Sequence, residues 1–400
     1  MTDLSAAINR VKPSPTVALT GRVAELRASG REIIGLGAGE PDFPTPEHIS
    51  DAAIAAIRDG KTRYTAPDGI RELKEAIVGK FERENNIRYT PDHVIVSTGG
   101  KQVIFNALLA TLDPGDEVLI PAPYWVSYPD IVRLAGATPV ILETTAKTGF
   151  KLSADQLSGA ITERTKWIIL NSPSNPTGAA YTHSELAALL DVVAPFPALH
   201  VMADDIYEHL VYDGFKFATP AAVRPELADR TLIINGVSKA YAMTGWRIGY
   251  GAGPVPLIAA MRKLQGQSTS NACSIAQWAA VSALDGPQDF LKTRADAFRV
   301  RRDMVVDGLT EIDGIECSRP DGAFYVFPNI EKLLGRKTSD GHVLADDLSF
   351  AEALLDTNGV ALVPGTAFGA PGHVRISYAA SDADLSRAIS LISSFAASLN

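Results

Sequence analysis

The feature that most constrains the fold is a regular alternation of short apolar runs with longer helical segments between residues 90 and 250. The apolar runs are rich in β-branched residues, which is typical of buried strands. Strands are predicted at 94–97, 117–120, 139–142, 167–171, 200–204 and 232–234, and a helix at 101–112. Such alternation predicts an α/β fold, in which crossover helices cover both faces of a mostly parallel sheet.

The carboxyl-terminal third of the chain has a different pattern. A long, charged helix is predicted over 288–312. Shorter elements follow it, with strands at 322–327 and 373–377 and helices near 348–357 and 382–398. This mixture is typical of an α+β module. Because 400 residues exceed what one hydrophobic core usually supports, we expect this module to be a second domain.

Composition excludes several classes of function. The net charge of -9 argues against binding to nucleic acid or to another polyanionic surface. Cys273 and Cys317 lie far apart, and the histidines show no metal-ligand spacing, so neither a disulfide framework nor a metal site is predicted. The chain begins without a signal-peptide pattern and has no apolar run long enough to cross a membrane. A reducing, cytoplasmic location is therefore expected.

A reactive amine is predicted just after the strand at 232–234, where Ser238 and Lys239 follow a glycine-containing turn. An amine at the end of a buried strand is desolvated, which lowers its pKa and frees its lone pair to attack a carbonyl. The hydroxyl of Ser238 and the guanidinium of Arg247 suit a phosphate group. The alternative for Lys239 taken alone is an ordinary surface lysine.

Two further turns follow predicted strands. Gly99 and Gly100 open the helix after the first strand, where a close backbone and the positive helix end favour a phosphate. A plain strand–helix turn is the alternative for this pair. Trp125, after the second strand, could stack on a flat heteroaromatic ring or belong to the core.

Polar side chains also follow the next two strands. Asn175 stands in a proline-rich loop that aims its amide, which can donate to a phenolate oxygen. Asp204 ends its strand, where a carboxylate could keep a pyridine nitrogen protonated, and Tyr207 could donate to the ring oxygen. A helix N-cap is the alternative for Asp204. A Schiff-base lysine, a phosphate site and a pyridine-binding carboxylate together are what pyridoxal phosphate requires.

At this point the chain resembles the fold-type I pyridoxal-phosphate aminotransferases. Within them it is similar to the class I branch that holds the Thermus and rhizobial aspartate aminotransferases, some of which also use prephenate. The stretches that carry the resemblance are GAGEPDF at 37–43, YTAPDG at 64–69, GGK at 99–101, PAPYW at 121–125, NSPSNPTG at 171–178, DDIY at 204–207, SKAYAMTGWRIG at 238–249 and RISY at 375–378. They span nearly the whole chain in the family's order.

The resemblance implies a seven-stranded large domain over 46–288 and a smaller α+β domain built from 1–45 and 289–400. It implies that Lys239 carries the cofactor and moves a proton, that Asp204 pairs with the ring nitrogen, and that Tyr207 and Asn175 bond the ring oxygen. The phosphate would be held by Gly99, Gly100, Ser238 and Arg247. Trp125 would cover the ring, and Arg375, helped by the Gly39 backbone, would bind the substrate α-carboxylate. Tyr64 would reach the phosphate of the neighbouring subunit, so a homodimer is implied.

A dicarboxylic substrate has a second, distal carboxylate on its side chain, and the residues that would bind it need a separate argument. Many relatives bind it with an arginine of the partner subunit, yet residues 264–273 contain no arginine. In the Thermus and rhizobial branch, lysines at the positions of Lys101 and Lys12 receive this carboxylate instead. A solvated lysine is the alternative at both positions.

The resemblance therefore implies a ping-pong transfer of the amino group from aspartate or glutamate to a 2-oxo acid such as 2-oxoglutarate. Prephenate, which would give arogenate, is an additional expected acceptor. Three alternatives stay open: an aminotransferase for neutral or aromatic amino acids, a pyridoxal-phosphate C–S lyase, and a non-catalytic ligand-sensing domain. The last usually carries a DNA-binding extension, and no basic helix-turn-helix segment fits before residue 30.

Overall fold

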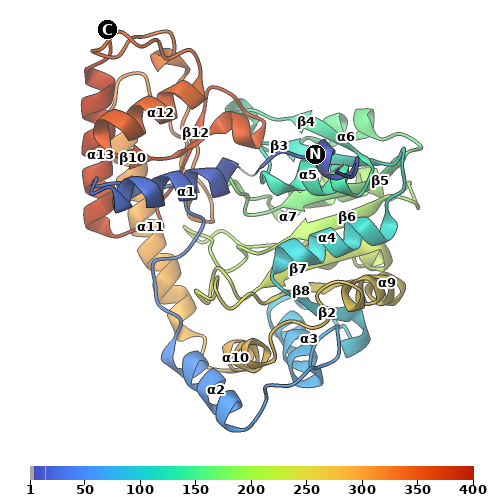
Figure 1. Cartoon of the computed structure of the whole chain (residues 1–400). Coiled ribbons are helices and arrows are strands. Elements are labelled where there is room, and N and C mark those ends of the chain that lie inside the picture. The colour runs from blue at the N-terminus through green and yellow to red at the C-terminus, as the bar shows by residue number, and fades with distance from the viewer. Residues whose placement is uncertain (1–3, 14) are drawn as a thin grey trace.

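A computed structural model describes residues 4–13 and 15–400. Its centre is a seven-stranded sheet in the order β2-β8-β7-β6-β5-β3-β4 (Figure 1). The strands are β2 (Val94–Ser97), β3 (Glu117–Ala122), β4 (Thr138–Glu143), β5 (Thr165–Asn171), β6 (His200–Asp204), β7 (Thr231–Gly236) and β8 (Gly249–Ala252). Neighbours from β7 to β4 pair in parallel, whereas β8 is antiparallel to both β7 and β2. The predicted α/β sheet is confirmed.

Helices bury both faces of this sheet, because successive strand residues point to opposite sides. On one face, Val118 and Met202 pack with helices α4 (Gly100–Thr111), α5 (Ser127–Leu134) and α9 (Val255–Gly266). On the other face, Leu119 and Val201 pack with residues of α6 (Ala154–Ala160), α7 (His183–Val193) and α8 (Pro220–Val223). Further along this second face lie α2 (Glu47–Arg58), α3 (Arg71–Asn85) and α10 (Ser274–Asp285). The inner strands are thus buried on both sides, as their near-continuous apolar runs require, while the edge strand β4 is partly exposed.

The remaining elements form a second core from both ends of the chain. Strand β1 (Ile34–Gly35) pairs in parallel with β10 (Val360–Ala361), and β11 (Val363–Pro364), β12 (Val374–Ser377) and β9 (Tyr325–Val326) form an antiparallel sheet. Around them pack α1 (Pro15–Ala28), α11 (Asp289–Thr310), α12 (Asp347–Asn358) and α13 (Asp382–Ala397). In Figure 1 the long α11 runs from the vicinity of α10 to this second core. The boundaries near 46 and 288 remain a prediction.

The main departure from the predicted elements is β8, which the sequence pattern does not indicate. Its residues alternate glycine with larger side chains, so they lack the β-branched run that marks the other strands. Glycine is required at Gly249, because a Cβ there would collide with the backbone of Gly99 and Gly100. The strand predicted at 322–327 is also shorter than expected and comprises only Tyr325–Val326.

Within residues 4–13 and 15–400, no helix combines the length and the apolar character needed to cross a membrane.

Candidate active site

The carboxyl ends of the sheet strands open onto a cavity of about 630 Å³ between the central sheet and the second core. Ligands in open α/β sheets bind in this position. The predicted residues that line the cavity are Gly39, Gly100, Lys101, Trp125, Asn175, Asp204, Tyr207, Ser238, Lys239, Arg247 and Arg375. Lys12, Tyr64 and Gly99 are not among its lining residues. The fold therefore brings together side chains that lie far apart in the sequence.

Lys239 lies in the cavity just beyond the end of β7. Its Nζ donates a hydrogen bond to the carbonyl oxygen of Gly39 at 2.5 Å and lies 5.9 Å from the centre of the Tyr207 ring. Burial, together with the positive charge of Arg375, lowers the pKa of Lys239 to about 8. An amine with such a pKa is neutral more often than an ordinary lysine, so it is suited to attack a carbonyl or to accept a proton.

Asp204 is buried at the end of β6. Its Oδ2 accepts a hydrogen bond of 2.5 Å from the hydroxyl of Tyr128, a residue of α5 that sequence analysis did not select. Burial raises the pKa of Asp204 to about 6, although the bond from Tyr128 acts in the opposite direction. A perturbed carboxylate that lines a cavity is a candidate for direct contact with a ligand.

The start of α4 has the features of an anion-binding site. The first amides of a helix have no partner within it, and Gly100 is the first residue of α4. Ser238 and Arg247 line the cavity here, and a Cβ on Gly99 would collide with the Arg247 guanidinium. Arg247 itself has a φ of 57°, a conformation that is rare for non-glycine residues and frequent at functional sites. Gly99 therefore gives Arg247 room beside the helix terminus.

Arg375 lines the cavity from β12, a strand of the second core. Its Nη1 donates to Asn175 Oδ1 at 2.8 Å and its Nη2 to the carbonyl oxygen of Gly37 at 2.6 Å. Its guanidinium also packs over the ring of Tyr325 at 4.6 Å. Among the described residues its Nε is buried without a hydrogen-bond partner. A fixed, buried guanidinium with a free donor is suited to a carboxylate.

Tyr325 is a second residue that sequence analysis missed. Its hydroxyl lies 2.9 Å from the hydroxyl of Tyr207, and both side chains line the cavity. Tyr128 and Tyr325 share the reason for being missed: buried tyrosines in apolar surroundings are most simply core residues. Only the direction of their hydroxyl groups, which the sequence does not give, marks them as part of the site.

Lys101 and the amino-terminal segment form one rim of the cavity. The Nζ of Lys101 lies 4.9 Å from the centre of the Trp125 ring. Partial burial and then the charge of Arg247 lower the pKa of Lys101. The short helix η1 (Ile8–Arg10) packs against α5, and α1 contributes Thr16 and Thr20 to the cavity lining. Lys12, which is exposed, lies in the stretch between these two helices.

Tyr64 lies elsewhere, with 92% of its surface exposed. It lines a separate hollow beside Lys61 and Trp278, where the Lys61 Nζ lies 4.7 Å from the centre of the indole ring. Tyrosine is among the residues that are enriched at contacts between protein chains.

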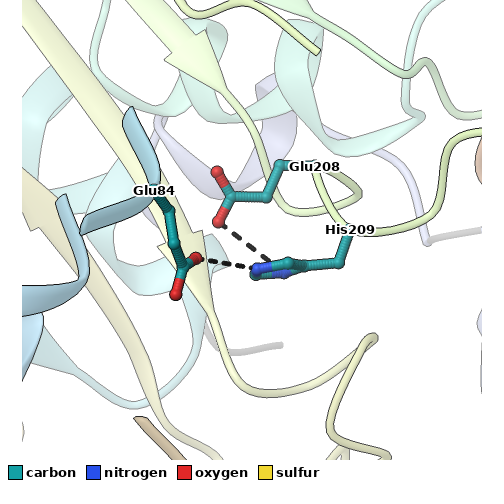
Figure 2. Close-up of side chains that lie close together, drawn as sticks. All are labelled: Glu84, Glu208 and His209. Carbon is teal, nitrogen blue, oxygen red and sulfur yellow. Dashed lines mark hydrogen bonds and ion pairs between the residues drawn. The ribbon is translucent and has the colours of Figure 1, made fainter. Parts of the chain in front are cut away.

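A second group of titratable side chains lies close together outside the cavity: Glu84, Glu208 and His209 (Figure 2). His209 Nε2 lies 2.9 Å from Glu84 Oε2, and the buried ammonium of Lys80 is paired with Glu208 and lies 3.7 Å from Glu84. Although burial raises it, the pKa of Glu84 falls to about 2 because of His209 and Lys80. Since Lys80 supplies positive charge inside the group, we interpret it as an ion-pair cluster that ties the segment after Tyr207 to α3.

Comparison with known proteins agrees with this geometry. The family model of the class I and II aminotransferases matches residues 31–392. The aspartate/prephenate aminotransferase of Cereibacter sphaeroides is 59% identical over 400 residues, covering 100% of both chains. The crystal structure of the Rhizobium meliloti aspartate aminotransferase superimposes with a TM-score of 0.97 at 50% identity, covering 100% of both chains. The structure of the Thermus thermophilus aspartate aminotransferase with maleate superimposes with a TM-score of 0.93 at 44% identity, covering 99% of this chain and 100% of that chain.

These matches extend over the whole described fold, including the cavity and both cores. The sequence matches and the structural matches indicate the same family. The chain belongs to the class I and II aminotransferases and is a transaminase of fold-type I.

Proposed function

We propose that this transaminase uses pyridoxal phosphate and transfers amino groups between dicarboxylic substrates, with aspartate and 2-oxoglutarate as the leading pair. Prephenate is proposed as an additional acceptor. The observation that carries the proposal is the arrangement of cations around one cavity: Arg375 is fixed on one wall with a free Nε, and Lys101 stands at the rim. Relatives named for aspartate and prephenate support the choice of substrates.

The residues present fit pyridoxal phosphate. Lys239, with its lowered pKa, would hold the cofactor through its amine, and Gly99, Gly100, Ser238 and Arg247 would hold the phosphate. Asp204 would pair with the ring nitrogen, while Tyr207 and Asn175 would bond the ring oxygen and Trp125 would cover the ring. When bound, the cofactor supplies an electron sink for the negative charge that develops at the substrate Cα.

The chain's own residues supply binding, orientation and proton transfer. Arg375 binds the α-carboxylate as a fork, because Asn175 and the Gly37 carbonyl already fix its guanidinium plane. Lys239, as a neutral amine, would accept a proton from the substrate Cα and deliver it to the cofactor. Asp204, as a carboxylate, holds a proton on the ring nitrogen by charge pairing.

We further propose a homodimer, in which Tyr64 reaches the phosphate site of the partner subunit. Its exposure beside the hollow that holds Trp278 supports this role, because the side chain is outside the cavity of its own chain and free to contact another. A cytoplasmic location is proposed on the strength of Cys273 and Cys317, which are both free thiols.

The experiment that tests the proposed function is a panel of amino donors and oxo acceptors. Aspartate, glutamate, alanine, phenylalanine and kynurenine would be paired with 2-oxoglutarate, and glutamate and aspartate with prephenate. If aspartate or glutamate has the highest kcat/KM among the amino donors, the proposal is supported. A clear preference for alanine, phenylalanine or kynurenine would replace it with a neutral-substrate aminotransferase, and release of sulfide from cysteine substrates would indicate a lyase.

The substitution Arg375→Lys is expected to weaken all amino donors together by about 2–4 kcal/mol in kcat/KM, because the charge stays while the two-pronged contact is lost. Steady-state kinetics with aspartate, glutamate and alanine would measure the effect. Arg302→Lys is the matched control, since Arg302 is also a buried arginine but pairs with Asp213 and Asp303 in the second core. A loss confined to dicarboxylic donors would place Arg375 at the distal carboxylate instead.

Lys101→Ala and Lys12→Ala are each expected to lower kcat/KM for aspartate and prephenate by about 1–3 kcal/mol, the scale of a charge-assisted contact. The slow activity on alanine should change much less, because alanine has no second carboxylate. The segment that carries Lys12 lies near the chain start and joins η1 to α1, so we expect it to close over bound substrate. Lys147→Ala, which removes an exposed lysine away from the cavity, is the control. Equal losses for alanine and aspartate would refute the assignment.

A further inference from the structure

Tyr128 contacts the candidate ring-binding carboxylate directly. It is the second residue of α5, only 2% of its surface is exposed, and its hydroxyl donates to Asp204 Oδ2 at 2.5 Å. Its ring meets that of Trp125 edge to face, with 5.3 Å between the centroids. Both the ring packing and the helix restrict the side chain, so the hydroxyl has a fixed direction.

The carboxylate form of Asp204 is stabilised by a small set of neighbouring groups. Burial favours the neutral acid and raises the pKa to about 6, while the Tyr128 hydroxyl, the Ile206 amide and the charge of Lys239 favour the carboxylate. Asp205 and Tyr207 are the titratable groups nearest to Asp204 along the chain, and both are buried with pKa values well above their usual ranges. Neither supplies positive charge at neutral pH. Tyr128 is thus the side-chain donor on which the charged form of Asp204 depends.

We propose that Tyr128 is a positioning residue for the transaminase reaction, whose hydroxyl orients Asp204 and keeps it in the carboxylate form that a protonated ring nitrogen requires. The proposal rests on the proposed function through the role of Asp204. Its physical core, the dependence of Asp204 on Tyr128, can be measured in the protein without cofactor or substrate.

The test is Tyr128→Phe, which removes the hydroxyl and keeps the ring. In cofactor-free protein, the ionisation of Asp204 would be followed by its infrared carboxyl band, assigned by subtraction of Asp204→Asn spectra. The apparent pKa of Asp204 is expected to rise by about one to two units, the equivalent of one lost charge-assisted hydrogen bond. In the loaded enzyme the acid limb of the pH profile of kcat/KM should move upward in the same direction.

Tyr181→Phe is the matched control. Tyr181 is also a buried tyrosine, its hydroxyl accepts a hydrogen bond from the Leu152 amide at 2.8 Å, and it does not line the main cavity. The Tyr181→Phe substitution should therefore leave the titration of Asp204 unchanged. Site-specific 3-fluorotyrosine at position 128 gives a second test that keeps the native shape. Its more acidic hydroxyl is a stronger donor, so the apparent pKa of Asp204 should fall.

An Asp204 titration that is unchanged in both Tyr128 variants would overturn the inference and leave the transaminase assignment intact. Conversely, normal turnover of Asp204→Ala would remove the proposed role of Asp204 while the infrared result could still stand. The two failures are therefore distinguishable.

Discussion

Replacement of Lys239 by alanine is expected to lower kcat by about 10⁴-fold, the upper end of what a positioned general base contributes. The loss is large because the same amine would hold the cofactor and move the proton at the substrate Cα. Single-turnover kinetics with aspartate would measure it. In the native protein loaded with cofactor, borohydride reduction followed by peptide mapping should place the label on Lys239.

The lowered pKa of Lys239 gives this prediction a control that needs no cofactor. The neutral amine is the reactive form, and its fraction grows as pH rises through the pKa. Modification of Lys239 by an amine-directed reagent should therefore reach half its maximal rate near pH 8, in keeping with its pKa of about 8. An unperturbed lysine side chain would reach half its maximal rate only near about pH 10.4. A reduced label on Lys101 in place of Lys239 would contradict the assignment of the whole site.

Replacement of Asp204 by alanine is expected to reduce turnover by on the order of a hundredfold or more, because several kcal/mol of charge stabilisation in the transition state is lost. Cofactor binding through the phosphate contacts should persist, which equilibrium titration of the visible band would show. Asp205→Asn is the matched control, since Asp205 is the adjacent buried carboxylate and does not line the cavity. Near-normal turnover of Asp204→Ala would show that the carboxylate has no part in the reaction.

The sequence predicted the sheet because its inner strands are buried on both faces, so their apolar runs are nearly continuous, whereas the edge strand β4 is partly exposed. The same property explains the failure at β8, where close packing of Gly249 against Gly99 and Gly100 replaces side-chain burial. Hydrogen bonding within a sheet depends on the backbone, and a glycine-rich strand therefore leaves little trace in a hydrophobic pattern.

The site residues also differ in how far the sequence alone can place them. Asp204 ends a buried strand and Lys239 lies just beyond the end of another, so the carboxyl edge of the sheet places both without further information. Tyr128 and Tyr325 act through the direction of one hydroxyl group, which depends on packing between segments far apart in the chain. The roles proposed for Lys12 and Tyr64 would require closure of the amino-terminal segment and a second subunit, respectively. Their roles remain predictions because a single folded chain does not contain the contacts that would define them.

The short strand β1 has a consequence for how the two cores influence each other. From β1 the chain runs directly into the cavity: the Leu36 carbonyl accepts from the Ser377 amide, the Gly37 carbonyl from Arg375 and the Gly39 carbonyl from Lys239. One extended segment therefore links the sheet of the second core, the proposed carboxylate fork and the reactive amine. Rotation of the second core about the central sheet would displace this extended segment. The hydrogen bond from Lys239 to the Gly39 carbonyl would then change, although no side chain in the cavity had been substituted. Substitutions in the β1–β10 pair, such as at Ile34 or Val360, would then change the basicity of Lys239, which is distant from both in the sequence.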